Sequence, residues 1–233
     1  MGSFVYTGQE NLEAMKEATN YNRYLTSLIE EQIIEIPKKT PAILDFGAGI
    51  GTYADLLLDK GYRADCLELD TDQIKLLRSK DYTVIEGLDR AKKKYDIIYA
   101  FNVFEHIEQD IDVFAELSKL LATGGLIIIY VPAFQVLYSA MDRLVEHHRR
   151  YSLARLQMMA STADLRVRYL GYGEPIGFLA ALVYKRFGNK NGTITPASVK
   201  FYDRVAFPIS RAISPLFKRL FGKNALLIAK KEK

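Results

Sequence analysis

The sequence predicts an α/β fold with a doubly wound, mainly parallel sheet. Short apolar runs suited to buried strands alternate with stretches of helical spacing over residues 41–172. Glycines at alternating positions follow the first apolar run, and a glutamate ends the second. Strand, glycine turn and helix in this order make a nucleotide-binding unit, in which the helix N-terminus faces the ligand. A chain of 233 residues suffices for one such domain with an additional segment.

Composition and charge exclude several classes of protein. Hydrophobic residues make up 49% of the chain and charged residues 26%, as in an ordinary globular protein. The net charge of +4 is too small to indicate nucleic-acid binding. The single cysteine, Cys66, lies in an apolar run, so we expect a buried thiol and no disulfide within the chain. No signal-peptide pattern and no apolar run of about eighteen residues is visible, which predicts a cytoplasmic protein.

The glycine turn at 47–51 follows a predicted strand at 42–46 and precedes a predicted helix at 52–60. Glycine allows a tight turn and removes the Cβ atoms that would keep a ligand away from the backbone. The spacing is G-x-G-x-G, and Thr52 stands where a dinucleotide motif has its third glycine. Asp45 would repel a pyrophosphate but could pair with an ammonium group. Both features argue against a nicotinamide-dependent oxidoreductase, which we keep as an alternative.

The second predicted strand, 62–69, ends in Glu68 about twenty residues after the glycine turn. In a doubly wound nucleotide fold, this position carries the acid that accepts hydrogen bonds from the ribose hydroxyls. Asp70 is the alternative, but it also suits the N-cap of the helical stretch that follows. We therefore predict Glu68 at the ribose and Asp70 at the cap, and the reverse assignment stays open.

Further elements follow the same periodicity. A third strand is predicted at 82–86 and a fourth at 95–101. We expect the glycines at 124 and 125 to end the next helix. The remaining predicted elements are helix 110–121, strand 126–131, helix 153–161, strand 164–172 and a last strand at 225–230.

Three stretches of this chain resemble class I S-adenosylmethionine-dependent methyltransferases, firmly over residues 41–132. They are the glycine turn with its preceding acid, the Asn-Val-Phe-Glu-His-Ile segment at 102–107, and the Leu-Leu-Ala-Thr-Gly-Gly-Leu-Ile-Ile-Ile-Tyr-Val-Pro run at 120–132. The nearest likeness is to bacterial enzymes of small-molecule, glycan or lipid pathways. The resemblance implies a Rossmann-like, seven-stranded sheet with an antiparallel last strand. It also implies S-adenosylmethionine as cofactor and methyl transfer to a small or lipid- or glycan-linked acceptor, at oxygen.

The resemblance also implies which residues surround the cofactor. The acid and the glycine turn would hold its amino-acid part, and the residues after the third strand would line the adenine. An N-terminal helix often closes over the cofactor in this family, although packing on the sheet explains the same periodicity at 14–34. The expected cofactor-binding residues are Tyr21, Asp45, Phe46, Gly47, Ala48, Gly49, Glu68, Leu69, Leu88, Asp89 and Asn102.

Catalysis of methyl transfer needs an aligned acceptor and, for a hydroxyl, a base. The resemblance makes His106 the leading base, with Glu105 as its orienting group, although both could simply brace the following helix. Some methyltransferases carry Glu-x-x-Glu-His here and bind a divalent ion with a further histidine. Because Asn102 replaces the first glutamate, we expect no metal, and a mixed site with His147 or His148 remains the alternative.

The loop at 141–151 gathers two histidines, three arginines, two acids and a tyrosine. It follows the fifth strand and resembles a His-x-Arg-Arg-Tyr segment of the same bacterial group. We expect Arg149, Arg150 and Tyr151 to bind the acceptor, because arginine forks suit carboxylates and phosphates. His147 and His148 are alternative bases. An ion-paired loop capped onto the next helix by Ser152 explains the same residues without an acceptor.

The chain is predicted to form one domain: a helical cap at 1–40, a cofactor-binding core at 41–172, a helical insertion at 173–223 and a last strand within 224–233. We expect Pro208 and Pro215 to break the insertion into short helices, with a hinge at 189–198. The insertion could form a lid, a homodimer contact or a basic surface for anionic lipid. A cofactor-binding regulator without catalysis remains an alternative function.

Overall fold

The structure, a computed structural model, describes residues 15–187 and 196–232. Within these ranges seven strands form one sheet in the order β3-β2-β1-β4-β5-β7-β6. The strand β7 runs antiparallel to both of its neighbours, and the remaining pairs are parallel. This confirms the predicted fold class. The strands are β1 (Ile43–Phe46), β2 (Ala64–Leu67), β3 (Val84–Ile85), β4 (Tyr95–Phe101), β5 (Leu121–Pro132), β6 (Arg166–Gly173) and β7 (Asn224–Lys230).

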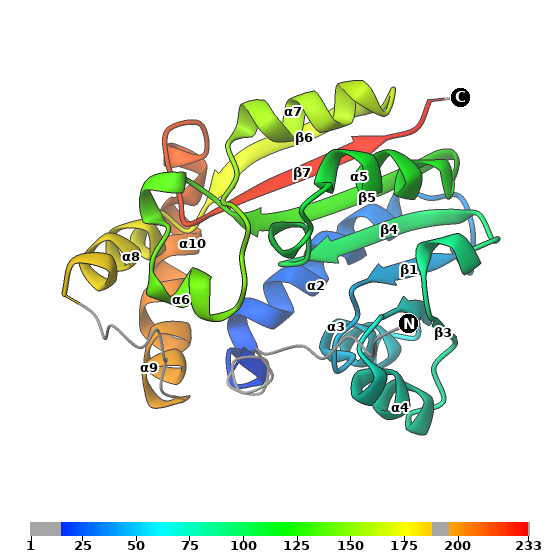
Figure 1. Ribbon diagram of the computed structural model, residues 1–233, viewed down its shortest axis with the longest axis horizontal. Coiled ribbons are helices and arrows are strands. Elements are labelled where there is room, and N and C mark those ends of the chain that lie inside the picture. The colour runs from blue at the N-terminus through cyan, green and yellow to red at the C-terminus, as the bar shows by residue number, and fades with distance from the viewer. Residues whose placement is uncertain (1–14, 188–195, 233) are drawn as a thin grey trace.

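Helices cover both faces of the sheet (Figure 1). The helices are α2 (Thr19–Ile34), α3 (Thr52–Leu58), α4 (Thr71–Ser79), α5 (Asp110–Lys119), α6 (Ala140–Leu144), α7 (Leu153–Thr162), α8 (Pro175–Phe187), α9 (Pro196–Phe201) and α10 (Phe207–Phe217). On one face α5 and α7 pack on the central strands, and on the other face α2 and α3 do so. Every residue of β4 is buried, as expected for a parallel strand covered on both sides.

The predicted boundary between α5 and β5 is wrong. The helix ends at Lys119, and β5 begins at Leu121, so the glycines at 124 and 125 lie inside the strand. Gly124 has φ +78°, and the pairing of β4 with β5 shifts register between Tyr95 and Ile97. A Cβ on Gly125 would lie 2.9 Å from the carbonyl oxygen of Tyr95. The glycines therefore serve a bulge in the sheet, which requires close backbone approach.

The helical insertion follows β6 and contains α8, α9 and α10. The prediction that prolines break it is wrong, because α9, a π-helical turn at Tyr202–Ala206 and α10 follow one another without a gap. Pro208 lies in the first turn of α10, where a missing N–H is tolerated, and Pro215 lies in its last turn. Of the predicted hinge, residues 189–195 lie outside the described ranges, and Pro196 already belongs to α9.

The insertion also holds the N-terminal helix. Asp203, which is 2% exposed, accepts hydrogen bonds from the backbone N–H groups of Asn20 and Tyr21, at 2.9 and 2.8 Å. A carboxylate at this end satisfies two orphan donors and complements the helix dipole. The helix α2 therefore begins at Thr19, later than the predicted residue 14, and its cap comes from the far end of the chain.

Candidate active site

The glycine turn after β1 is built as the spacing predicts. Gly47, Gly49 and Gly51 have φ values of +75°, +56° and +82°, in the left-handed region that side chains disfavour. A Cβ on Gly47 would lie 2.6 Å from the side chain of Val103, which follows β4. The turn therefore lies against the carboxyl end of β4, where ligands bind in open α/β sheets.

Asp45 lies at the base of this turn and is 2% exposed. Its carboxylate lies beside the hydroxyl of Tyr99, yet neither Oδ2 of Asp45 nor Oη of Tyr99 has a hydrogen-bond partner of normal geometry among the described residues. Burial raises the pKa of Asp45 to about 8, and the nearby charge of Glu68 adds to this rise. A buried carboxyl of this kind gains most from a cationic partner.

Glu68 bridges β2 and the glycine turn. Its Oε2 accepts the N–H of Gly49 at 2.7 Å, and its Oε1 accepts those of Leu69 and Asp70 at 2.7 and 3.0 Å. Asp70 caps α4, because its side chain accepts two backbone N–H groups of the first turn. The predicted cap is confirmed, and Glu68 is the acid that faces the turn.

The other predicted cofactor residues are spread around the same edge of the sheet. Asn102 follows β4 with φ +55°, and its Nδ2 donates to the hydroxyl of Tyr21 at 3.2 Å, so α2 does reach this edge. The ring of Phe46 packs on Phe104 inside the core. Ala48 is buried, Leu88 is partly buried, and Leu69 and Asp89 are exposed.

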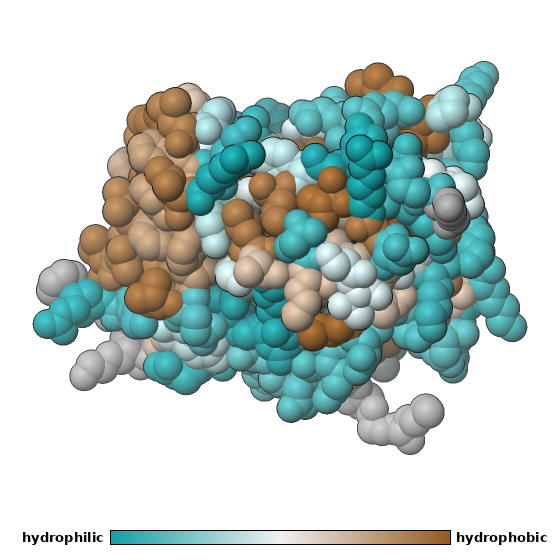
Figure 2. Space-filling view, turned by 90° about the horizontal axis from the view of Figure 1, so that it is seen from above, coloured by the Kyte–Doolittle hydropathy of each residue, from teal (hydrophilic) through white to brown (hydrophobic). Residues whose placement is uncertain are grey.

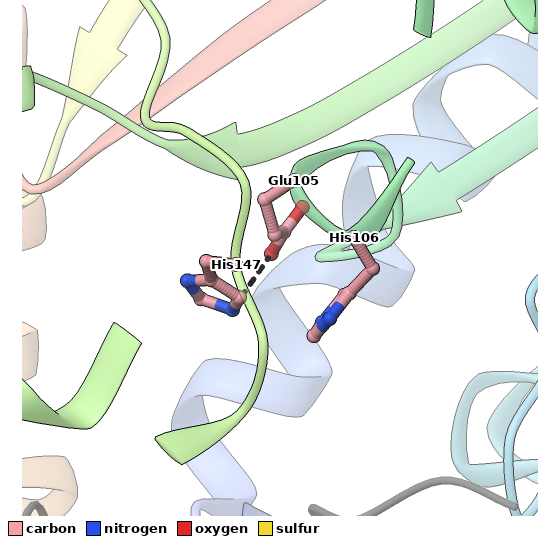
Figure 3. A group of neighbouring side chains, drawn as sticks. All are labelled: Glu105, His106 and His147. Carbon is pink, nitrogen blue, oxygen red and sulfur yellow. Dashed lines mark ion pairs between the residues drawn. The ribbon is translucent and has the colours of Figure 1, made fainter. Parts of the chain in front are cut away.

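A second group of side chains lies just beyond Asn102. Glu105 and His106 belong to a 3₁₀ turn after β4, and His147 comes from the loop after α6; the three side chains converge (Figure 3). Nε2 of His147 lies 3.9 Å from Oε1 of Glu105, and the two histidine rings meet edge to face with centroids 4.6 Å apart. The structure thus brings together three of the four predicted catalytic residues.

Asp142 orients His147. Its Oδ1 lies 2.8 Å from Nδ1 of His147, and its two oxygens accept Nε and Nη2 of Arg150 at 2.8 and 3.0 Å. Burial alone would raise the pKa of Asp142, but the hydrogen bonds from His147 and Arg150 outweigh it and hold this pKa well below its usual range. The ionised carboxylate therefore fixes the ring so that Nε2 of His147 faces Glu105.

Burial is the main cause of the pKa shifts of Glu105 and His106. It raises the pKa of Glu105 to about 7, and the charge of His147 offsets part of this rise. It lowers the pKa of His106 to about 3, and repulsion from His147 lowers it further. His106 is therefore a neutral imidazole at pH 7, with a backbone hydrogen bond at Val145.

The arginines and tyrosine predicted to bind the acceptor have partners within the chain. Arg150 is held by Asp142, and Arg149 pairs with Asp110 at 2.6 Å. Tyr151 is 1% exposed. Its hydroxyl oxygen lies 2.8 Å from Oδ2 of Asp110 and 2.8 Å from the carbonyl oxygen of Phe104, and the hydroxyl donates to this pair of acceptors. These contacts join the loop after α6 to the turn after β4. We therefore propose that these three side chains brace the site.

His148 differs from His147 although the two are adjacent. Its side chain is exposed, whereas its backbone N–H donates to the carbonyl oxygen of Glu105 at 2.7 Å. Glu146, with φ +59°, turns the chain just before the pair. This turn points His147 inward and leaves His148 at the rim.

A family model described as a methyltransferase domain matches residues 18–170, which include all of the residues above. The chain belongs to this family of S-adenosylmethionine-dependent methyltransferases. A curated relative, malonyl-[acyl-carrier protein] O-methyltransferase 2 of Ilyobacter polytropus, is 27% identical over 135 residues. The match covers 51% of this methyltransferase and 51% of the relative, so the chain spans about half the length of the curated relative.

Solved structures of methyltransferases share the fold. A SAM-dependent methyltransferase from Archaeoglobus fulgidus superposes with a TM-score of 0.58 at 19% identity, over 90% of this chain and 94% of that chain. Magnesium protoporphyrin IX methyltransferase from Synechocystis PCC 6803, solved with bound SAM, gives 0.56 at 12% identity, over 91% and 80%. At these identities the likeness concerns the fold alone.

Asp142 is the functional residue that sequence reasoning did not single out. It stands at the third position of α6, three residues after Ser139, whose backbone N–H donates to Oδ2 of Asp142 at 2.8 Å. The Ser-x-x-acid spacing of a helix N-terminus was visible in the sequence. That spacing accounts for one of the partners of Asp142, whereas the contact with His147 depends on the folded loop.

Replacing Glu68 should weaken S-adenosylmethionine binding. The Glu68→Ala variant loses a charge-assisted acceptor, so we expect the affinity to fall by roughly 1.5–3 kcal/mol, or about 10–150-fold. Isothermal titration calorimetry measures this directly. Asp72→Ala, an exposed acid on α4, is the matched control and should bind normally. Unchanged affinity in Glu68→Ala would place the ribose elsewhere.

Cofactor binding should release a proton from Asp45. At pH 7 this carboxyl is mostly protonated, and pairing with the cofactor's ammonium group would ionise it. The affinity should therefore rise by up to about tenfold per pH unit from pH 6 to 8 and then level off. Calorimetry in two buffers of different ionisation enthalpy counts the protons. Asp45→Asn should bind weakly at every pH without this proton release, and absence of release in the parent protein would contradict the pairing.

Proposed function

We propose that this methyltransferase transfers the methyl group of S-adenosylmethionine to an oxygen atom of a small or lipid-linked acceptor. The observation that carries the proposal is the inward-facing Nε2 of His147, aligned by buried Asp142 and lying beyond Asn102 at the carboxyl ends of β4 and β5. The O-methyltransferase activity in the name of the Ilyobacter relative supports oxygen as the acceptor atom.

The chemistry asks little of the protein beyond alignment and proton removal. The acceptor oxygen attacks the methyl carbon in line as the carbon–sulfur bond breaks, and the demethylated cofactor leaves as a neutral thioether. The hydroxyl proton must go to a nearby base. With Nδ1–H of His147 donating to Asp142, Nε2 is the accepting end of the neutral ring. We therefore place the acceptor hydroxyl beside His147, which replaces His106 as the leading base.

The surface of the helical insertion supports an acceptor presented by a lipid layer. Figure 2 shows an apolar area over the end of the molecule where α8 and α10 lie. In the sequence, Asp203 is the only acid between residues 175 and 223, and it is buried. The exposed cations in the described part of this stretch are Lys185, Arg186, Lys200, Arg204, Arg211, Lys218 and Arg219. Exposed apolar side chains together with exposed cations suit an anionic membrane surface. These exposed apolar residues, here called the insertion surface, are Leu179, Val183, Phe201, Val205, Ile209, Leu216 and Leu220.

The insertion surface would rest on a lipid layer without crossing it. In the described part of the chain no helix is long and apolar enough to span a membrane. The first turn of α8 packs near the site, since Phe178 meets the ring of Phe134, which follows β5, at 5.2 Å between centroids. A contact between two copies of the chain is the other occupant that this surface would suit.

Replacing His147 should slow turnover and spare cofactor binding. His147→Asn removes the proton acceptor, so we expect the rate constant to fall by about 10²–10⁴. Turnover is measured with methyl-labelled cofactor and an acceptor found by screening, and cofactor affinity by calorimetry. Loss of turnover in His148→Asn or His106→Asn alone would move the base to that residue. If none of the three variants affects turnover, the three histidines are structural and the base lies elsewhere. If the parent chain binds the cofactor but methylates no screened acceptor, a regulator without catalysis becomes the better interpretation.

The insertion surface should bind anionic vesicles in a salt-dependent way. The chain should sediment with phosphatidylcholine vesicles that contain phosphatidylglycerol, and less with phosphatidylcholine alone or at high salt. A double change, Ile209→Glu with Leu216→Glu, should abolish this binding. Ile34→Glu, which alters an 82% exposed residue on α2, is the matched control. Conversion of a dimer to a monomer by the double change, with vesicle binding intact, would identify a dimer contact instead.

A further inference from the structure

Glu105 has no exposed surface, and neither oxygen of its carboxylate has a hydrogen-bond partner of normal geometry among the described residues, although its own backbone N–H offsets part of the rise in its pKa. Oε1 of Glu105 lies 3.9 Å from Nε2 of His147, and one ligand atom from each of Glu105, His106 and His147 lies within 4.8 Å of the others. A carboxylate buried without partners is costly unless a cation compensates it. A positively charged ligand would therefore stabilise the carboxylate of Glu105.

Both histidines are already oriented by contacts of their own. Nδ1 of His147 is engaged by Asp142 at 2.8 Å, and His106 has a hydrogen bond with the backbone of Val145. Metal-binding histidines characteristically make such a bond with one ring nitrogen, to a carboxylate or a backbone carbonyl, and present the other nitrogen to the ion. Asp142 is in turn fixed by Arg150, so this support is itself rigid.

We propose that Glu105, His106 and His147 bind one divalent transition-metal ion of the zinc class, and that this ion holds the acceptor oxygen. The proposal rests on the proposed function and names the device that activates the acceptor at that site. Two imidazoles and one carboxylate suit Zn²⁺, whereas Mg²⁺ prefers oxygen ligands alone. Three protein ligands leave a coordination position open for an acceptor.

The distances require only side-chain adjustment. Ligand atoms around a tetrahedral zinc ion lie about 3.4 Å apart, given bonds of about 2.1 Å. Nε2 of His147 and Oε1 of Glu105 are separated by 3.9 Å, and the group as a whole by up to 4.8 Å. A closure of up to about 1.4 Å brings the three atoms into coordination distance.

The role of Asn102 also differs from the one that led us to expect no metal. A missing glutamate at this position weakened the metal hypothesis in the sequence. In the structure, Asn102 turns toward Tyr21, and His147 supplies the third ligand from the loop after α6. The ligand set is therefore complete without residue 102.

The step at the ion balances without any further reagent. Coordination lowers the pKa of the acceptor hydroxyl, whose proton passes to solvent water. The metal-bound oxygen then forms the new carbon–oxygen bond as the carbon–sulfur bond breaks. His147 in this case acts as a ligand, and the role of Asp142 in holding its ring is unchanged.

Metal binding can be measured without an acceptor. Chelator-treated full-length protein is titrated calorimetrically with Zn²⁺, Mn²⁺ and Mg²⁺, and with Co²⁺ by its visible absorption. We expect Zn²⁺ and Co²⁺ to bind at one equivalent, and Glu105→Gln to weaken both by more than about tenfold, since even the loss of an outer-sphere partner costs this much. Glu108→Gln, an exposed acid three residues along, is the matched control and should bind like the parent chain.

Thermal unfolding provides the second readout. Zn²⁺ should raise the melting temperature of the parent chain and of Glu108→Gln, and leave that of Glu105→Gln unchanged. Without metal, Glu105→Gln should be at least as stable as the parent chain, because it removes an uncompensated buried carboxylate. Equal metal affinity in Glu105→Gln and the parent chain, or no binding in either, would overturn the proposal.

The two proposals fail separately. If His147→Asn stops methyl transfer but chelation does not, the metal proposal is overturned and methyl transfer by an imidazole base stands. If Zn²⁺ binds through Glu105 but no screened acceptor is methylated, the metal site stands and the proposed function loses its support.

Discussion

The site depends on one buried carboxylate. Asp142 has no exposed surface and accepts hydrogen bonds from Arg150, from the ring of His147 and from the backbone of Ser139. Each partner belongs to the loop after β5, so this one group fixes the start of α6, the path of the loop and the direction of His147. A charge so buried is stable only when its partners are in place. The loop is therefore ordered as a unit or not at all.

A second carboxylate joins this loop to the rest of the fold. Asp110, at the start of α5, pairs with Arg149 and Arg155 and accepts the hydroxyl of Tyr151. The hydrogen bonds of Arg155 and Tyr151 overcome the effect of burial and hold the pKa of Asp110 below its usual value. Arg149 and Arg150 of the loop therefore form ion pairs within the chain, with Asp110 and Asp142. The contrast with Glu105, a buried carboxylate without such partners, is what distinguishes a brace from a binding group.

The sequence allowed the sheet to be predicted because strand burial leaves a local pattern. Both ends of the central strand β4 were predicted to the residue, because its apolar residues form one nearly uninterrupted run in the sequence. Gly124 and Gly125 were predicted to end a helix but lie at a sheet bulge, because a helix stop and a bulge use the same residue type. For the same reason Pro208 appeared to be a helix break, although a proline in the first turn of a helix is compatible with it.

The candidate site was only partly accessible from the sequence. The glycine turn and Glu68 follow the two adjacent parallel strands of one βαβ unit, so their proximity follows from the fold class. Glu105 and His147 come from two separate loops. The hydrophobic periodicity of the sequence does not predict how such loops lie against each other. Acceptor binding by Arg149, Arg150 and Tyr151 stays a prediction from the sequence, and only the folded chain shows the carboxylates that these side chains contact.

The cap that Asp203 places on α2 has a consequence for how the chain becomes competent. The helix that carries Tyr21 to Asn102 is synthesised among the first elements, but its terminal N–H groups find their acceptor only when residue 203 has been added. During synthesis, which proceeds from the N-terminus, strands β1 to β5 can pair before this edge of the ligand site is closed. Because β7 follows the insertion and joins β6 to β5, the cap on α2 and the completion of the sheet both wait for this last part of the nucleotide-binding domain.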